Sequence, residues 1–359
     1  MTHQLIEIIE GARNCVVKVA NVQKGHRVLI FTDTAVDPLI AHTLAAVAKE
    51  VGGEVAIMTL PFETSEASEV GGTMPAHVVE AARASQIVLS PTSYPLQHTL
   101  SLRGMAPHDD QPPMERTWIN IPPPHFINLS CDGARRVPSS VILKLRSRTI
   151  EKMKKGKTYR MTTESGTDIT TQQDLTTPGG TAAVPIPFGR FSVFPLGVLN
   201  PPGYPHKDGS GILVADFVDC FPGVLSQPIR YTIKDGYAVK VEGGYEADWI
   251  RREMERVGFE HSSPWWEFSM GMNPCIPINR NNFEALKVHC PALAHRTAGV
   301  VHIAVGIDPY FHLHGTILEP TITCLETGEK IVDKGVLAAL SDEDVREEMK
   351  ASGVTPSRW

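Results

Sequence analysis

Helical and strand-like hydrophobic patterns alternate over the first 145 residues of the chain. The predicted elements are, in order, a helix at 4–21, a strand at 24–33, a helix at 37–51, a strand at 52–61, a helix at 76–85 and a strand at 86–93. Asp37 and Pro38 are residue types preferred at a helix N-cap and at the first helical position. Because alternating strands and helices favour a parallel sheet, we predict a doubly wound α/β domain at residues 1–148.

From about residue 158 the pattern changes to short strand-like segments separated by glycine and proline turns. These segments are 158–165, 211–219, 228–243, 299–307 and 312–335. A single clear helical pattern, at residues 246–257, interrupts them. This pattern is typical of an α+β domain rich in antiparallel strands, which we place at residues 149–359.

Length, charge and cysteine usage narrow the class of protein. The 359 residues exceed the roughly 250–300 that one hydrophobic core usually serves, which also favours two domains. A formal net charge of -6, from 34 Lys+Arg and 40 Asp+Glu, argues against nucleic-acid partners. The chain has no apolar run long enough for a membrane helix, no signal-peptide layout at its start and no CxxC pair among its six cysteines. We therefore expect a cytoplasmic protein with reduced thiols that binds neither nucleic acid nor membrane.

The strongest candidate for chemistry is the segment FHLHGTILEPT. Alternate side chains of a strand share a face, so His312 and His314 are expected to point the same way. Two adjacent imidazoles can bind a divalent first-row metal ion when a third ligand comes from elsewhere. The alternative is a pair of hydrogen-bonded histidines without a metal.

Three further residues of this half are candidates for the same site. His261 follows the predicted helix at 246–257 and is either a ligand or only a cation at the helix end. Glu267 follows two tryptophans, and this dense aromatic segment argues for partial burial. His302 lies inside an apolar strand, where a hydrogen-bonded core histidine is the simpler interpretation.

Two candidates come from turns and loops. His98 follows the third predicted strand, at the carboxyl end where open α/β sheets gather ligands, although a lone histidine in a loop is usually solvated. Glu164 stands beside a glycine turn from which it can reach a site. The chain has no GxSxG nucleophile elbow and no cysteine in a recognisable protease context, so covalent nucleophilic catalysis is not favoured.

The order of several short motifs resembles a known group of metalloenzymes. The motifs are ESGTDIT, LNPPG, DGSGILVAD, EFSMGMNP, GVVHIAVG and HLHGTILEPT, preceded in the first half by QHTLSLRGM. In this order they resemble the thermophilic metallo-aminopeptidases and, more closely, their shorter relatives, the 2,5-dihydroxypyridine 5,6-dioxygenases. In the aminopeptidases a metal-binding Glu follows the Asn-Pro-Pro-Gly turn, where this chain has Tyr204, and the last metal pair is His-x-Asp, where it has His312-Leu313-His314. Both departures argue against a dinuclear peptidase site.

The resemblance to the dioxygenases implies one Fe(II) ion held by His261, His312 and, in place of the family's Asp, His314. Glu267 and His302 are the rival third ligands and, with Tyr204 and Trp266, the expected substrate-binding residues. The resemblance also implies that His98 is the acid/base, and we assign Glu164 to orienting the substrate.

The implied reaction is extradiol-type ring cleavage by O2 of a dihydroxylated N-heteroaromatic or a related aromatic diol. The family suggests a homodimer. The competing hypothesis is a Zn(II) hydrolase of an amide, cyclic imide or lactone, and a third is a binding protein without catalysis.

Overall fold

The structure is a computed structural model whose chain packs into two compact units. One unit comprises residues 1–137 and 180–196, and the other comprises residues 138–179 and 197–359. The residues that the structure describes are 2–62, 73–94, 96, 99, 102, 116–121, 127–173, 179–200, 208–218, 225–279, 291–307 and 310–357. The division into domains between residues 148 and 149 stays a prediction.

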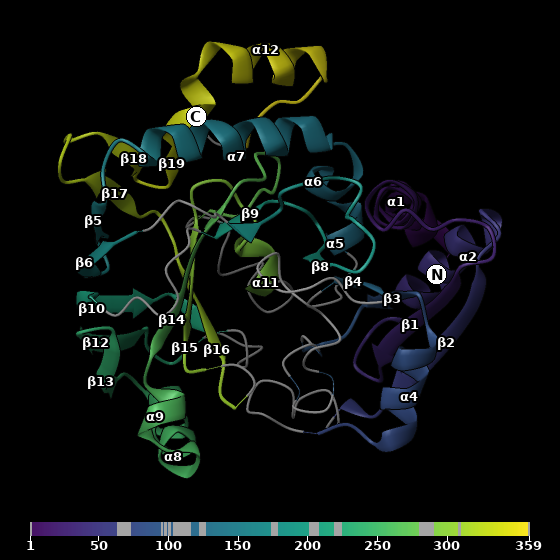
Figure 1. Cartoon of the computed structure of the whole chain (residues 1–359), viewed down its shortest axis with the longest axis horizontal. Coiled ribbons are helices and arrows are strands. Elements are labelled where there is room, and N and C mark those ends of the chain that lie inside the picture. Colours follow the sequence, from purple (N-terminus) through teal and green to yellow (C-terminus); the bar gives the residue numbers. More distant parts are fainter. Residues whose placement is uncertain are drawn as a thin grey trace. The chain divides into compact units, whose positions relative to one another are not determined.

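The first unit contains a five-stranded parallel sheet in the order β2-β1-β3-β4-β8 (Figure 1). Its strands are β1 (Arg27–Asp33), β2 (Glu54–Leu60), β3 (Ile87–Ser90), β4 (Thr117–Asn120) and β8 (Phe191–Val193). Its helices are α1 (Thr2–Arg13), η1 (Asn14–Val19), α2 (Pro38–Glu50), α4 (Ala76–Ala84), α5 (Ile127–Ser130) and α6 (Asp132–Arg135). The predicted α/β region with a parallel sheet is confirmed.

Burial of β1 on both faces explains its continuous apolar sequence. Leu29 and Phe31 pack in one cluster with Val78 of α4, while Val28 and Ile30, on the opposite face, are equally buried. β2 lies at the sheet edge and is correspondingly more exposed. The predicted cap of α2 is present, because an Asp37 side-chain oxygen accepts a hydrogen bond from the Leu39 backbone amide at 2.9 Å.

The second unit contains two sheets whose paired strands run antiparallel. The eight-stranded sheet has the order β13-β12-β10-β6-β5-β17-β18-β19. Its strands are β5 (Thr158–Thr162), β6 (Asp168–Gln172), β10 (Ser210–Ala215), β12 (Ile229–Lys234), β13 (Tyr237–Glu242), β17 (Thr321–Cys324), β18 (Lys330–Asp333) and β19 (Val336–Leu337). Asp235 and Gly236 both have positive φ and form the two-residue turn between β12 and β13.

The six-stranded sheet has the order β11-β16-β15-β14-β9-β7, and β14, β15 and β16 run side by side in Figure 1. Its strands are β7 (Gly179–Gly180), β9 (Val198–Asn200), β11 (Phe217–Val218), β14 (Trp265–Gly271), β15 (Val301–Val305) and β16 (Leu313–Ile317). The predicted richness in antiparallel strands is confirmed, although the hydrophobic pattern did not predict β14.

The helices of this unit are α7 (Ser139–Met153), α8 (Tyr245–Val257), α9 (Phe259–Ser262), α11 (Pro291–Ala294), η4 (Ala338–Ser341) and α12 (Glu343–Ala351). The helix predicted at 246–257 is confirmed as α8. Within the described part of the chain, no helix has the length and apolar character needed to cross a membrane.

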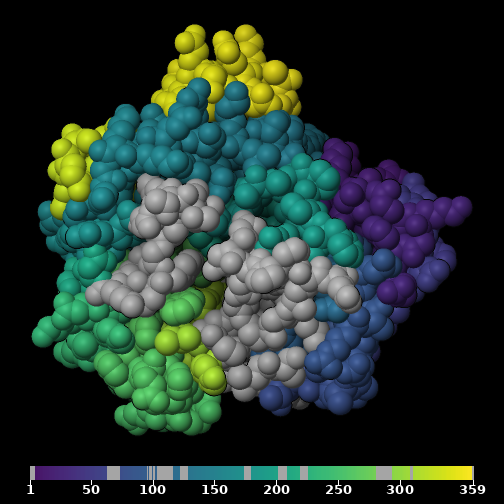
Figure 2. Space-filling model, in the orientation of Figure 1, coloured from purple at the N-terminus to yellow at the C-terminus, as the bar shows by residue number. Residues whose placement is uncertain are grey.

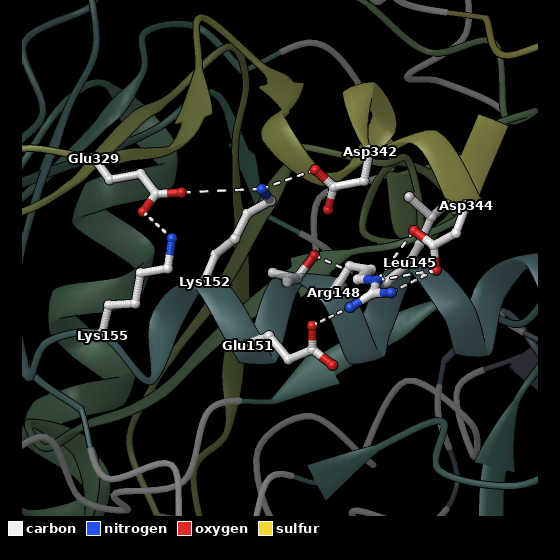
Figure 3. Close-up of polar contacts among 9 residues, drawn as sticks. Leu145, Arg148, Glu151, Lys152, Lys155, Glu329, Asp342 and Asp344 are labelled. Atoms are coloured by element: carbon white, nitrogen blue, oxygen red, sulfur yellow. Dashed lines mark hydrogen bonds and ion pairs between the residues drawn. The ribbon is translucent and has the colours of Figure 1, made fainter.

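A network of charged side chains connects α7 to the C-terminal part of the chain (Figure 3). Arg148 Nε and Nη2 donate to the Asp344 carboxylate at 2.9–3.1 Å, and Lys152 Nζ lies 2.9 Å from Asp342 Oδ1. Val345 and Met349 are the buried residues of α12, which lies against α7 at the surface (Figure 2). Apolar burial and a bidentate ion pair therefore both hold α12 in place.

We expect Asp344→Asn to remove an acid-sensitive contribution to stability. The hydrogen bonds from Arg148 hold the pKa of Asp344 below its usual value. The ionised carboxylate therefore stabilises the fold above the unfolded-state pKa of about 3.9, and this stabilisation is lost as the pH falls through the folded-state pKa. The variant should lower the midpoint of thermal unfolding at pH 7 by about 1–2 °C, the size usual for a partly exposed ion pair.

The pH dependence separates this effect from a general charge effect. The difference between Asp344→Asn and the wild type should shrink as the pH falls below about 3.9 and vanish once the pH is below the lowered folded-state pKa of Asp344, as measured by calorimetry. Glu347→Gln, which makes the same change in charge on the exposed side of α12, is the control and should leave the midpoint unchanged. An equal loss in both variants, or a loss independent of pH, would contradict the assignment.

Candidate metal centre

The register of three neighbouring strands gathers acidic and imidazole side chains on one face of the six-stranded sheet. Glu267 of β14 pairs with Ala304 of β15, which pairs with His314 of β16. His312 lies two residues before His314, and His302 lies two residues before Ala304. Because side chains two apart on a strand, and side chains directly opposite across strands, share a face, these four polar side chains are neighbours.

A β-bulge decides that Glu267 belongs to this face. Trp265 pairs with Val305, and Glu267 pairs with the next residue of β15, Ala304. Trp266 is therefore an extra residue of β14 that has no partner on β15. The bulge shifts the alternation of β14, because without it Trp265 and Glu267 would share a face. Instead Trp265 packs edge-on against Phe268 at 6.2 Å between ring centroids, on the opposite side.

The Glu267 carboxylate lies at the centre of three imidazoles. Its Oε2 is 3.4 Å from His302 Nε2, 3.6 Å from His312 Nε2 and 3.7 Å from His314 Nε2. One ligand atom from each of Glu267, His312 and His314 falls within 4.8 Å of the others, and their side chains are 13%, 5% and 8% exposed. Two imidazoles and one carboxylate are the protein ligands of the non-haem Fe(II) oxygenases, so the donor set fits such an ion.

Burial and neighbouring groups set the protonation of this cluster. Burial by itself raises the pKa of Glu267, but the three imidazoles of His302, His312 and His314 facing its carboxylate hold that pKa well below its usual range. Burial lowers the pKa of His302 to about 3, and the nearby His295 lowers it further. An ionised carboxylate beside a neutral imidazole is the form in which such groups bind a cation.

The structure adds a histidine that the sequence analysis did not identify. The ring of His295, directly after α11, lies 3.9 Å from that of His302 and stacks on Phe217 at 6.0 Å. His295 is 1% exposed. The sequence signal that could have identified His295 is a high local density of histidines, because five of the chain's 14 histidines fall between residues 289 and 314.

His261, predicted as the first ligand, is not part of the cluster. It lies in the one-turn helix α9, its side chain is 37% exposed, and its ring stacks on Tyr310 at 4.4 Å. Its Nε2 is 3.7 Å from Glu260 Oε1, and its backbone carbonyl accepts a hydrogen bond from the Ile307 amide at 2.6 Å. His261 therefore anchors the loop that leads to His312 through its backbone. Glu267, the rival third ligand, occupies the place beside the histidine pair.

The other predicted site residues fall in different places. Glu164 lies in the turn between β5 and β6, where its side chain is 93% exposed and 3.9 Å from Lys334 Nζ, so it faces solvent. Trp266 is half-buried at the bulge. His98 and Tyr204 lie outside the described residues, and their roles as acid/base and pocket residue stay predictions.

Comparison with known proteins tests the resemblance seen in the sequence. The family model NicX, described as 2,5-dihydroxypyridine 5,6-dioxygenase, matches residues 132–273. The predicted relationship is confirmed. The matched stretch contains Glu267 and ends before the histidines of β15 and β16. A search of curated proteins found no match.

Two solved structures share the fold. A 2,5-dihydroxypyridine dioxygenase from Pseudomonas putida KT2440 is 17% identical with a TM-score of 0.65, and the match covers 96% of this chain and 99% of that chain. Wild-type AmpT from Thermus thermophilus is 13% identical with a TM-score of 0.62, and the match covers 94% of this chain and 99% of that chain. Because the sequence identities are this low, the two structural matches establish a shared fold and nothing more.

We expect Glu267, His312 and His314 to be required for binding of a divalent first-row metal ion. Glu267→Gln, His312→Ala and His314→Ala should each weaken Co(II) binding by more than about 100-fold, because each removes one of three donors. Competition with a coloured chelator measures this affinity in the metal-free protein.

His261→Ala is the matched control, since it removes a histidine of the same unit whose side chain lies outside the cluster. Its Co(II) affinity should stay within about threefold of the wild type, because no ligand is lost. A loss in His261→Ala as large as that in His312→Ala would restore His261 as a ligand and contradict the assignment of Glu267.

Proposed function

We propose that the protein is a metal-dependent, ring-cleaving dioxygenase whose metal ion is held by Glu267, His312 and His314. The observation that carries the proposal is the convergence of a largely buried carboxylate from β14 and two buried imidazoles from β16 and the residue before it, across the intervening strand β15. The family match to 2,5-dihydroxypyridine 5,6-dioxygenase supports the same reaction class. The two lines of support share Glu267 but not the two histidines, because the match ends before His312.

We assign Fe(II) to this site. When bound, Fe(II) supplies the redox chemistry that lets O2 react with an aromatic ring and leaves coordination positions open beside its three protein ligands. The chain's own contribution is to hold Glu267 ionised, to keep both imidazoles in place on a rigid sheet and to limit water around them. In such a dry site, electrostatic interactions with substrate are stronger than in water.

The charge of the donor set favours an anionic substrate. A divalent ion with one carboxylate and neutral imidazoles keeps a charge of about +1. A dihydroxylated N-heteroaromatic, or a related aromatic diol, can lose one proton and bind through the resulting anionic oxygen, which would neutralise the site. Such a substrate would be bound in reach of O2, and the two would react without a free intermediate leaving the site.

A metallohydrolase is the second candidate. The same two-histidine, one-glutamate set occurs in zinc hydrolases, where a fourth position holds water. The fold shared with AmpT is the observation that keeps this candidate. The two functions differ in their need for O2.

We expect protein loaded anaerobically with Fe(II) to consume O2 when 2,5-dihydroxypyridine is added. One O2 should disappear per ring, as followed with an oxygen electrode, and mass spectrometry should find both atoms of ¹⁸O2 in the ring-opened product. His312→Ala, prepared in the same way, should show at least about a 100-fold lower rate, because the ion is no longer held.

Two outcomes would contradict the dioxygenase. The first is iron-loaded protein that consumes no O2 with any of a panel of dihydroxypyridines and hydroquinones. Turnover of an amide, cyclic imide or lactone by Zn(II)-loaded protein under argon would instead establish the hydrolase.

A further inference from the structure

The two oxygens of the Glu267 carboxylate lie in different surroundings. Oε1 accepts a hydrogen bond from the Ser269 hydroxyl at 2.5 Å, whereas Oε2 faces the imidazoles at 3.4–3.7 Å. Ser269 is fully buried and lies two residues along β14, on the same face as Glu267. A short hydrogen bond between a hydroxyl and an ionised carboxylate is among the stronger hydrogen bonds in proteins.

We propose that Ser269 and His302 are positioning residues that make Glu267 a one-oxygen metal ligand. The inference rests on the proposed metal centre. Ser269 holds Oε1, so only Oε2 is directed toward the histidine pair. Ser269 and His302 are directly opposite each other on β14 and β15, so the strand register fixes both next to the same carboxylate.

His302 is held in turn by aromatic packing behind it. The rings of His295 and His302 pack edge to face, with an interplanar angle of 70°. The ring of His295 lies parallel to that of Phe217, at an interplanar angle of 6°. These three residues are at most 7% exposed, so rotation of His302 away from Glu267 would require movement of a packed cluster.

The restraint on Glu267 determines how much of the ion's coordination sphere is free. With one oxygen from Glu267 and one nitrogen each from His312 and His314, the protein occupies three positions of an octahedral ion. If both oxygens of Glu267 were bound, only two positions would be left for substrate and O2 together. By holding Oε1 away from the ion, Ser269 would keep one more position free for substrate and O2.

The test is Co(II) binding to the metal-free protein with Ser269→Ala, which removes only the hydroxyl. We expect Ser269→Ala to weaken Co(II) binding by about 10–100-fold, the usual effect of removing an outer-shell partner of a ligand. Ser269→Thr, which keeps the hydroxyl, should recover affinity to within about threefold of the wild type. Chelator competition gives the affinities, and circular dichroism confirms that each variant is folded.

Thr316→Val is the matched control. Thr316 is also fully buried, lies on the same face opposite His302, and has no hydrogen-bond partner for its hydroxyl among the described residues. This variant should bind Co(II) within about threefold of the wild type, because it leaves the Glu267 carboxylate untouched. His302→Leu gives a second measurement, with an expected loss of about tenfold and recovery by His302→Gln.

The outcomes separate this inference from the proposed function. Ser269→Ala with wild-type Co(II) affinity, or a loss in Thr316→Val equal to that in Ser269→Ala, would overturn the positioning role. Wild-type protein that binds Co(II) but never consumes O2 would overturn the dioxygenase alone. Wild-type protein that binds no Co(II) would overturn the metal centre and the positioning role together.

Discussion

The second unit is organised around a carboxylate that is buried next to imidazoles. A lone ionised carboxylate in a protein interior is expensive, since the lost hydration must be replaced by hydrogen bonds and opposite charge. One oxygen of Glu267 accepts a hydrogen bond from Ser269, and the other faces the imidazoles of His302, His312 and His314. These groups replace the lost water. All of these partners come from three adjacent strands, so the sheet must be correctly registered before the charge can be accommodated.

Local patterns in the sequence predicted the features that depend on local structure. The parallel sheet followed from alternating helical and strand-like segments, and the α2 cap followed from Asp37 and Pro38. The two-residue period of a strand was enough to bring His312 and His314 to one carboxylate. The C-terminal helix α12 was not predicted, because its apolar stripe consists of only Val345 and Met349, one turn apart, and a helix this short depends on packing against α7.

The third member of the cluster could not be found in the same way. β14 contains a bulge, so its hydrophobic pattern is not a clean alternation, and the face of Glu267 could not be deduced by counting from Trp265. Distance along the chain from the histidine pair favoured His261 instead. His261 lies on a one-turn helix, and its side chain is partly exposed to solvent. Its backbone hydrogen bond with the Ile307 amide cannot be seen in a sequence.

The extra residue at Trp266 has a consequence for how relatives of this chain should be aligned. A relative that lacks the bulge has one residue fewer in this strand. When residues are counted from a shared point before the bulge, equal numbers after it then fall on opposite faces of the sheet. A comparison that matches residues by number alone would therefore put the half-buried Trp266 in the column of the acidic residue of the cluster. Homologues are better compared by the strand pairs they form, since a ligand can move by one place in a sequence without leaving its place in space.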